Sequence, residues 1–125
     1  MDIAELNKEQ LDAVQTAGGN MLILAGAGSG KTRVITYRIA YLINHGVSPS
    51  NILALTFTNK AANEMKDRLS SILSEEFSPS WIGTFHSICL RILRMNIEKV
   101  NYKKEFVIYD TYDQTAIIKD CMKQL

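Results

Sequence analysis

The sequence of 125 residues is long enough for one domain with an ordinary hydrophobic core. Its composition, with 46% hydrophobic, 22% charged and 8% aromatic residues, excludes a disordered tail, a collagen and a coiled coil. The net charge of +1 indicates no particular partner. Eleven bases against five acids between residues 31 and 104 fit either a surface that binds a polyanion or a solvated helix face.

Targeting signals are not apparent in the sequence. The longest apolar run, residues 21–27, is far shorter than the ~20 residues that a membrane span needs. The N-terminus carries Asp2 and Glu5 where a signal peptide would have a basic and an apolar stretch. Cys89 and Cys121 lack the spacing of a metal site. We therefore expect a cytoplasmic protein with two reduced, packed thiols.

The first predicted element is a capped helix. Asn7 is the expected N-cap, and Gln10 stands where a capping box needs its side chain. Leu6 and Leu11 have the spacing of a hydrophobic staple, and the glycines at 18–19 end the helix.

A continuous apolar run at residues 21–25 predicts a strand that is buried on both faces. A glycine-rich turn follows, and then a helix that begins at about Lys31 and ends before Gly46. The side chains expected on the buried stripe of this helix are Ile35, Ile39 and Leu42.

The same alternation of strand and helix continues. Residues 52–57 predict a second strand, residues 74–80 a loop, and residues 81–85 a third strand. The helix between the second and third strands has an apolar side that consists of Ala62, Met65, Leu69 and Ile72.

A further helix follows the third strand, with Ile88, Cys89 and Ile92 expected inward. Residues 106–109 predict a fourth strand, and Thr111 with Gln114 resembles a capping box that opens the last helix. Strands and helices that alternate in this way predict an α/β fold with a parallel sheet, with ligands bound at the carboxyl ends of the strands.

The strongest motif connects the first strand to its helix. Residues 25–32 fit the phosphate-loop (Walker A) pattern GxxxxGK followed by Ser or Thr, with alanine at the first position. Small residues let successive N–H groups converge on a phosphate, and the helix N-terminus adds its positive dipole end. Lys31, the predicted catalytic residue, can place its charge between two phosphates, and the Thr32 hydroxyl can bind Mg²⁺. A plain glycine-rich turn does not need Gly-Lys-Thr at its end. The predicted nucleotide-binding residues of the loop are Ala25, Gly26, Ala27, Gly28, Ser29, Gly30, Lys31 and Thr32.

Five stretches resemble the superfamily-one DNA helicases of the UvrD/Rep/PcrA type. Residues 6–14 resemble the adenine-reading Q motif, and residues 25–33 resemble motif I, which adds Arg33 to the nucleotide-binding residues. Residues 55–65 resemble motif Ia, residues 83–87 the TFH segment, and residues 109–114 the approach to an inserted helical subdomain. The likeness covers nearly the whole chain, in order.

The resemblance implies an incomplete RecA-like domain. Residues 1–110 would form part of the first RecA-like, ATP-binding domain, and residues 111–125 would begin the inserted subdomain. The implied activity is 3′-to-5′ DNA unwinding in repair or replication, with ATP and Mg²⁺ as cofactors. The implied partners are single-stranded DNA, its junctions with duplex DNA and the remainder of the helicase chain.

The carboxylates that hydrolysis requires are not recognisable in the sequence. Residues 106–110 imitate a Walker B strand, but no second acid follows directly. We therefore expect a chain that binds nucleotide without unwinding DNA and that self-associates through an exposed sheet edge. The alternative is a stand-alone P-loop module without a motor, and a small phosphate-loop kinase ranks lower because no cluster of lid arginines is present.

The resemblance also implies single residue roles. Gln10 would bind adenine, beside or instead of its role in the capping box. Phe57 would stack on a DNA base, or else belong to the core. Around it, Thr56, Thr58, Asn59 and Lys60 would bind a DNA phosphate, although Thr58 or Asn59 also suits a helix cap. The TFH segment adds Thr84, Phe85 and His86 to this predicted surface, although a lone histidine is more often a satisfied polar group.

Overall fold

The computed structural model describes residues 5–16, 18–73 and 81–124. The chain divides into two compact units, residues 1–89 and residues 90–125. Within the described ranges, no helix has both the length and the hydropathy that a membrane span requires.

The first helix, α1, spans Lys8–Gln15 and begins with the predicted capping box. The Asn7 side chain accepts a 2.8 Å hydrogen bond from the backbone N–H of Gln10. In return, Gln10 Oε1 accepts a 3.1 Å bond from the backbone N–H of Asn7. Two N–H groups that the helix itself leaves unpaired are thereby satisfied, which confirms the prediction.

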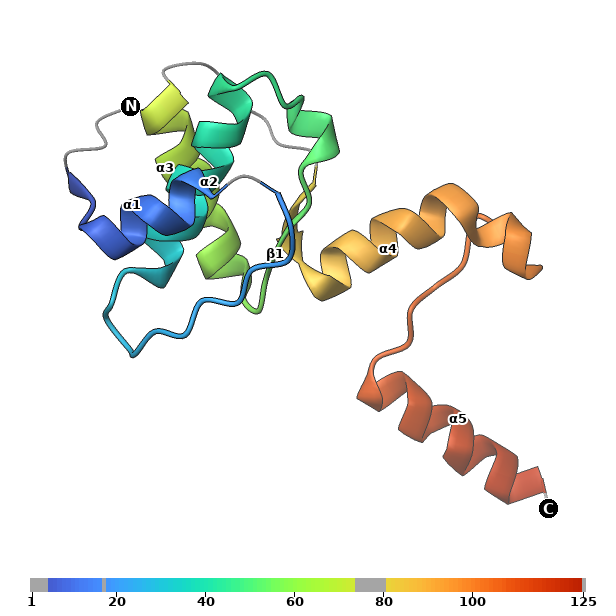
Figure 1. Ribbon diagram of the computed structural model, residues 1–125. Helices are drawn as coiled ribbons and strands as arrows, with labels where there is room; N and C mark the ends of the chain where they lie inside the picture. The colour runs from blue at the N-terminus through green and yellow to red at the C-terminus, as the bar shows by residue number, and fades with distance from the viewer. Residues whose placement is uncertain (1–4, 17, 74–80, 125) are drawn as a thin grey trace. The chain divides into compact units, whose positions relative to one another are not determined.

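The second helix, α2, spans Lys31–Asn44 and packs between α1 and α3 (Figure 1). Arg38 of α2 holds the end of α1, because its Nη1 donates to three backbone carbonyl oxygens. These belong to Ala13, Val14 and Thr16, at 3.0, 3.3 and 3.0 Å. The unpaired carbonyls at the end of α1 thus find a charged donor from the neighbouring helix.

The predicted buried stripe of α2 is only partly correct. Ile39 is buried, but Ile35 is exposed and Leu42 is half-buried. Because α2 has neighbours on two sides, its buried residues extend around the helix instead of following one stripe. They are Val34, Thr36, Ile39 and Ala40. The helix ends as predicted, before Gly46, whose φ is +88°.

Two short parallel strands form the sheet of the described structure. Strand β1 spans Ala54–Thr56 and strand β2 spans Ile82–Thr84, and they pair from Ala54 with Ile82 to Thr56 with Thr84. Helix α3, Asn59–Leu73, connects them across residues that the structure does not describe. The predicted loop at 74–80 lies among those residues. The second and third predicted strands and the α/β class are confirmed.

The hydrophobic core lies where α2, α3 and the sheet meet. Its cluster of buried residues consists of Ile39, Ala40, Ala54, Met65, Leu69 and Ile82. The apolar side predicted for α3 is confirmed, with Ala62, Met65 and Leu69 buried and Ile72 half-buried against the cluster.

Two of the four predicted strands are wrong for this structure. Residues 21–25 and 106–109 are neither helix nor strand, and Leu24 and Val107 are 87% and 75% exposed. A strand exists only where a neighbour completes its hydrogen bonds. In the described part of the chain, β1 and β2 pair with each other, and no third strand joins them.

The last two helices are α4, Phe85–Asn96, and α5, Thr111–Gln124. Ile88 of α4 is buried as predicted. Cys89 and Ile92 are exposed, which corrects their predicted inward position. Cys121 is also exposed, so both thiols are free but neither is packed. Ile88 is the one buried residue of α4, so the predicted inward side of this helix is buried only near its start.

The capping box predicted at Thr111 and Gln114 is wrong by one residue. The Asp110 carboxylate accepts from the backbone N–H of Asp113 at 2.9 Å, and the Asp113 carboxylate accepts from the backbone N–H of Asp110 at 3.1 Å. Asp110 is therefore the N-cap. Its carboxylate is the stronger acceptor, and two acids at a helix start also complement the helix dipole.

Candidate functional site

The glycine-rich loop turns the chain from the exposed apolar segment into α2. Gly28 and Gly30 have φ values of +75° and +86°, which side chains with a Cβ rarely adopt. Ser29 closes the turn, because its N–H and its hydroxyl both donate to the carbonyl oxygen of Gly26, at 3.4 and 2.7 Å. Gly30 then stands at the N-cap of α2 without a side chain to cover the free N–H groups. The turn therefore presents backbone donors to an anion.

Lys31 folds back over this loop. Its Nζ donates to the carbonyl oxygens of Ala25 and Gly26, at 2.9 and 2.7 Å. Both acceptors belong to the loop and the side chain is exposed, so the ammonium lies at the mouth of the turn. An arriving phosphate would therefore meet a positive charge that the loop already holds close to its N–H groups.

A cavity of about 480 Å³ lies against the loop. The side chains around it include the cations Lys31, Arg33 and Arg68, and no carboxylate of the described residues lines it. The described residues that line it are Gln10, Gly28, Ser29, Gly30, Lys31, Thr32, Arg33 and Arg68. Positive charge and a helix N-terminus together favour an anionic ligand in this cavity.

Gln10 connects α1 to this loop. Its Nε2 donates a 3.0 Å hydrogen bond to the backbone carbonyl oxygen of Ser29. Its Oε1 already belongs to the capping box, so the amide serves both elements at once. The contact is tight, since a Cβ added to Gly30 would lie 2.9 Å from Nε2. The capping role is confirmed, and the predicted contact with adenine stays a prediction.

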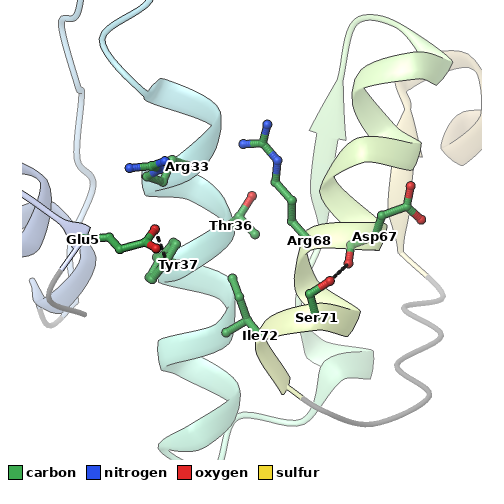
Figure 2. Close-up of a pocket in the computed structure, with 8 residues that line it drawn as sticks. All are labelled: Glu5, Arg33, Thr36, Tyr37, Asp67, Arg68, Ser71 and Ile72. Carbon is green, nitrogen blue, oxygen red and sulfur yellow. Dashed lines mark hydrogen bonds between the residues drawn. The ribbon is translucent and has the colours of Figure 1, made fainter. Parts of the chain in front are cut away.

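A second cavity, of about 360 Å³, lies between α2 and α3 (Figure 2). Arg33 and Arg68 line this cavity as well as the loop cavity. The remaining lining residues are Glu5, Thr36, Tyr37, Asp67, Ser71 and Ile72. Tyr37 donates from its hydroxyl to Glu5 at 3.4 Å.

Sequence reasoning did not find Arg68 as a site residue. The one available signal is its position three residues after the buried Met65, which places it beside the face of α3 that packs on α2.

The residues predicted to contact DNA gather at one edge of the sheet. Thr56 and Thr84 are register partners at the carboxyl ends of parallel strands, so Phe57 and Phe85 leave the sheet side by side. Phe57 is 95% exposed and Phe85 is 58% exposed. The alternative that Phe57 belongs to the core is therefore wrong. Asn59, Lys60 and His86 are also exposed at this edge.

The three threonines of this edge have local partners. Thr58 caps α3, because its hydroxyl accepts from the backbone N–H of Ala61 at 3.2 Å. The Thr56 hydroxyl donates to the carbonyl oxygen of Thr58 at 3.0 Å. Thr84 accepts from the backbone N–H of Ser87 at 3.2 Å and so starts α4. These hydroxyls shape the edge, whereas the aromatic rings, Asn59 and Lys60 face outward.

A metal site made by protein side chains alone is not found in the described ranges, where no three His, Cys, Asp or Glu side chains come together. Thr32 lies in the first turn of α2 and lines the loop cavity. Its hydroxyl is a hard oxygen donor of the kind that Mg²⁺ accepts together with phosphate oxygens.

The comparisons with known proteins identify the family of the chain. The profile of the UvrD/REP helicase N-terminal domain matches residues 6–125. The chain is 52% identical over 122 residues to the ATP-dependent DNA helicase PcrA of Staphylococcus epidermidis, which covers 97% of this chain and 17% of that protein. It is 51% identical over 119 residues to PcrA of Staphylococcus aureus, covering 94% of the chain and 16% of the relative. The chain thus spans about one-sixth of the length of these relatives, and it belongs to the UvrD/REP helicase N-terminal domain family.

Proposed function

We propose that this chain is the N-terminal, ATP-binding portion of an ATP-dependent DNA helicase that moves 3′ to 5′ along single-stranded DNA. Residues 1–110 correspond in this proposal to part of a first RecA-like domain, and residues 111–125 begin an inserted helical subdomain. The observation that carries the proposal is the cation-lined cavity at the N-terminus of α2. It occurs in a chain that shares 52% of its aligned residues with an ATP-dependent DNA helicase.

ATP occupies the loop cavity in this proposal. The N–H groups of the loop and of the first turn of α2 bind the phosphates, and Lys31 exchanges its loop carbonyls for phosphate oxygens. Thr32 holds Mg²⁺, which supplies positive charge to the triphosphate. Arg33 lines the same cavity. Gln10 keeps one Nε2 hydrogen and one Oε1 lone pair beyond its two bonds, so its amide still has a donor and an acceptor for adenine.

Single-stranded DNA crosses the edge formed by the ends of β1 and β2. Phe57 and Phe85 offer two exposed rings on which bases can stack. Asn59 and Lys60, at the start of α3, have donors for a backbone phosphate. His86 lies beside the same edge, in the first turn of α4. The bound single-stranded DNA would lead to the junction with duplex DNA.

Unwinding requires more than this portion. Phosphoryl transfer to water needs carboxylates that position the water and the metal, and a motor needs ATP between two domains that close and open. The chain spans about one-sixth of its helicase relatives, which leaves room for both elsewhere in such a protein. We therefore propose that these 125 residues bind nucleotide without unwinding DNA. A helicase of this kind acts in repair or replication, in the cytoplasm.

The exposed apolar segments fit the same proposal. Leu22 and Leu24 point into solvent, as do Val107 and Ile108. Side chains of this kind are normally covered, so we propose that further strands of a longer helicase chain pair with these segments, or that copies of the isolated chain associate through them.

A thermal-shift measurement with Mg-ATP tests the nucleotide site. A ligand at one hundred times its dissociation constant stabilises the folded chain by about 2.7 kcal/mol. We expect this shift for the natural sequence and a much smaller one for Lys31→Ala. If ATP stabilises neither protein, or both equally, the proposed site is wrong.

A further inference from the structure

We propose that Arg68, in the middle of α3, is a further phosphate-binding residue of the nucleotide site. This inference rests on the proposed function and extends the site to a helix outside the phosphate loop. Arg68 lines the loop cavity together with Gly28, Ser29 and Lys31, although it lies 37 residues after Lys31 in the sequence.

The Arg68 side chain is available for a ligand. Arg68 is exposed, and it forms no ion pair in the part of the chain that the structure describes. Its guanidinium presents parallel N–H donors that match two phosphate oxygens. A free fork of this kind on the wall of an anion-binding cavity is suited to phosphate.

The direction of the side chain supports the assignment. Figure 2 shows the Arg68 side chain extending from α3 toward the end of α2 that carries Arg33. That end is the N-terminus of α2, which follows the loop directly. Arg68 therefore approaches the anion site from the side opposite α1, whereas Gln10 reaches the loop from α1 itself.

Charge around the loop cavity favours phosphate over the nucleoside as the contact of Arg68. Among the residues that the structure describes, three cations and no carboxylate line this cavity. Glu5 and Asp67 line only the neighbouring cavity between α2 and α3, and Figure 2 shows the Asp67 carboxylate pointing away from α2. A triphosphate has several negative charges, whereas a carboxylate has one. The guanidinium of Arg68, which lines both cavities, is therefore attracted to the cavity that holds the ligand.

The test is a titration of the 125-residue chain with two ligands, Mg-ATP and inorganic tripolyphosphate. Tripolyphosphate has the phosphates of ATP without the base or ribose. We expect Arg68→Gln to weaken the binding of both by about tenfold, which corresponds to about 1.4 kcal/mol. Arg68→Lys keeps the charge but loses the fork, so it restores only part of the affinity. Lys66→Gln, on the same helix and outside both cavities, makes the same change in charge and should leave both affinities unchanged.

The outcomes separate this inference from the proposed function. If Arg68→Gln and Lys66→Gln bind both ligands equally well while Lys31→Ala loses them, Arg68 is a solvated surface residue and only this inference fails. If Arg68→Gln weakens ATP but not tripolyphosphate, the contact is with the nucleoside and the phosphate assignment is wrong. If the natural sequence binds neither ligand, both proposals fail. Equal thermal unfolding of Arg68→Gln and the natural sequence, expected because Arg68 is exposed, shows that the effect on binding is local.

Discussion

Gln10 and Ser29 are joined by a 3.0 Å hydrogen bond from the side-chain amide of one to the backbone carbonyl oxygen of the other. The same Gln10 side chain closes the capping box of α1. The side-chain amide of Gln10 therefore connects the start of α1 to Ser29 of the glycine-rich loop. A change at Gln10 acts on the loop even when no nucleotide is bound.

Two substitutions at Gln10 separate its roles. Glutamate keeps an oxygen that accepts from the Asn7 N–H, but it cannot donate to Ser29 and places a second acceptor against that carbonyl. We expect Gln10→Glu to retain the helicity of α1 and to lower ATP affinity. Gln10→Ala loses both bonds and should also lower the free energy of unfolding by about 1 kcal/mol. Chemical denaturation, circular dichroism and an ATP titration measure the three quantities. Equal ATP affinity in Gln10→Glu and the natural sequence would show that the bond to Ser29 does not organise the loop.

Gly30 is the loop position that is least able to carry a side chain. Its φ of +86° costs an L residue about 1–2 kcal/mol, and a Cβ would lie 2.9 Å from Gln10 Nε2. We expect Gly30→Ala to lower the free energy of unfolding by at least about 1 kcal/mol. Gly26→Ala is the matched control, because a Cβ at Gly26 meets nothing within 4 Å and its φ is not positive. Urea unfolding curves compare the two, and equal midpoints would contradict this account of Gly30.

Arg38 holds the C-terminal end of α1 through three carbonyl oxygens. Arg38→Met keeps an aliphatic side chain but removes these charged donors. The variant should therefore be less stable by about 1–2 kcal/mol, after a discount for the half-exposed position. Relative to the natural sequence, the variant should show a larger increase in the rate of amide hydrogen exchange in α1 than in α3. Arg94→Met, at an exposed position of α4, is the control and should change the stability little.

Local signals were sufficient wherever neighbouring residues alone decide the structure. The capping box of α1 and the end of α2 before Gly46 depend on contacts within a few residues, and the buried face of α3 follows the helical spacing of its apolar side chains. The glycine-rich turn belongs to the same class, since its positive-φ glycines and Lys31 interact within the turn itself. Spacing and residue type carry this information.

The predictions that failed concern structure that depends on interaction partners, and the local sequence pattern does not specify these partners. Residues 21–25 have the composition of a buried strand, but a strand needs a hydrogen-bonding neighbour, and none pairs with them in the described structure. The cap of α5 moved to Asp110 because two carboxylates could satisfy each other's N–H groups. Arg68 escaped notice because its place in the cavity follows from the packing of α3 on α2.

The exposed rings at the carboxyl edge of the sheet give the most direct test of DNA binding. Phe57 and Phe85 follow the register partners Thr56 and Thr84, so a single strand can meet both rings. We expect Phe57→Ala to weaken binding of a single-stranded oligonucleotide by about 1–3 kcal/mol without loss of stability, because a ring that is 95% exposed contributes little to packing. Phe85→Ala should have a smaller effect, since its ring is less exposed.

Tyr112→Ala is the matched control for this pair, since Tyr112 is an exposed aromatic of α5 that is not among the residues predicted to contact DNA. Fluorescence anisotropy of a labelled oligonucleotide measures the affinities, and repeating the titration at higher salt separates stacking from phosphate contacts. The loss on Phe57→Ala should persist as salt rises, whereas Lys60→Gln should lose its effect, because only the ionic contact depends on released counterions. Losses of equal size in Phe57→Ala and Tyr112→Ala would mean that exposed rings bind DNA wherever they lie and that the ends of β1 and β2 are not a DNA path.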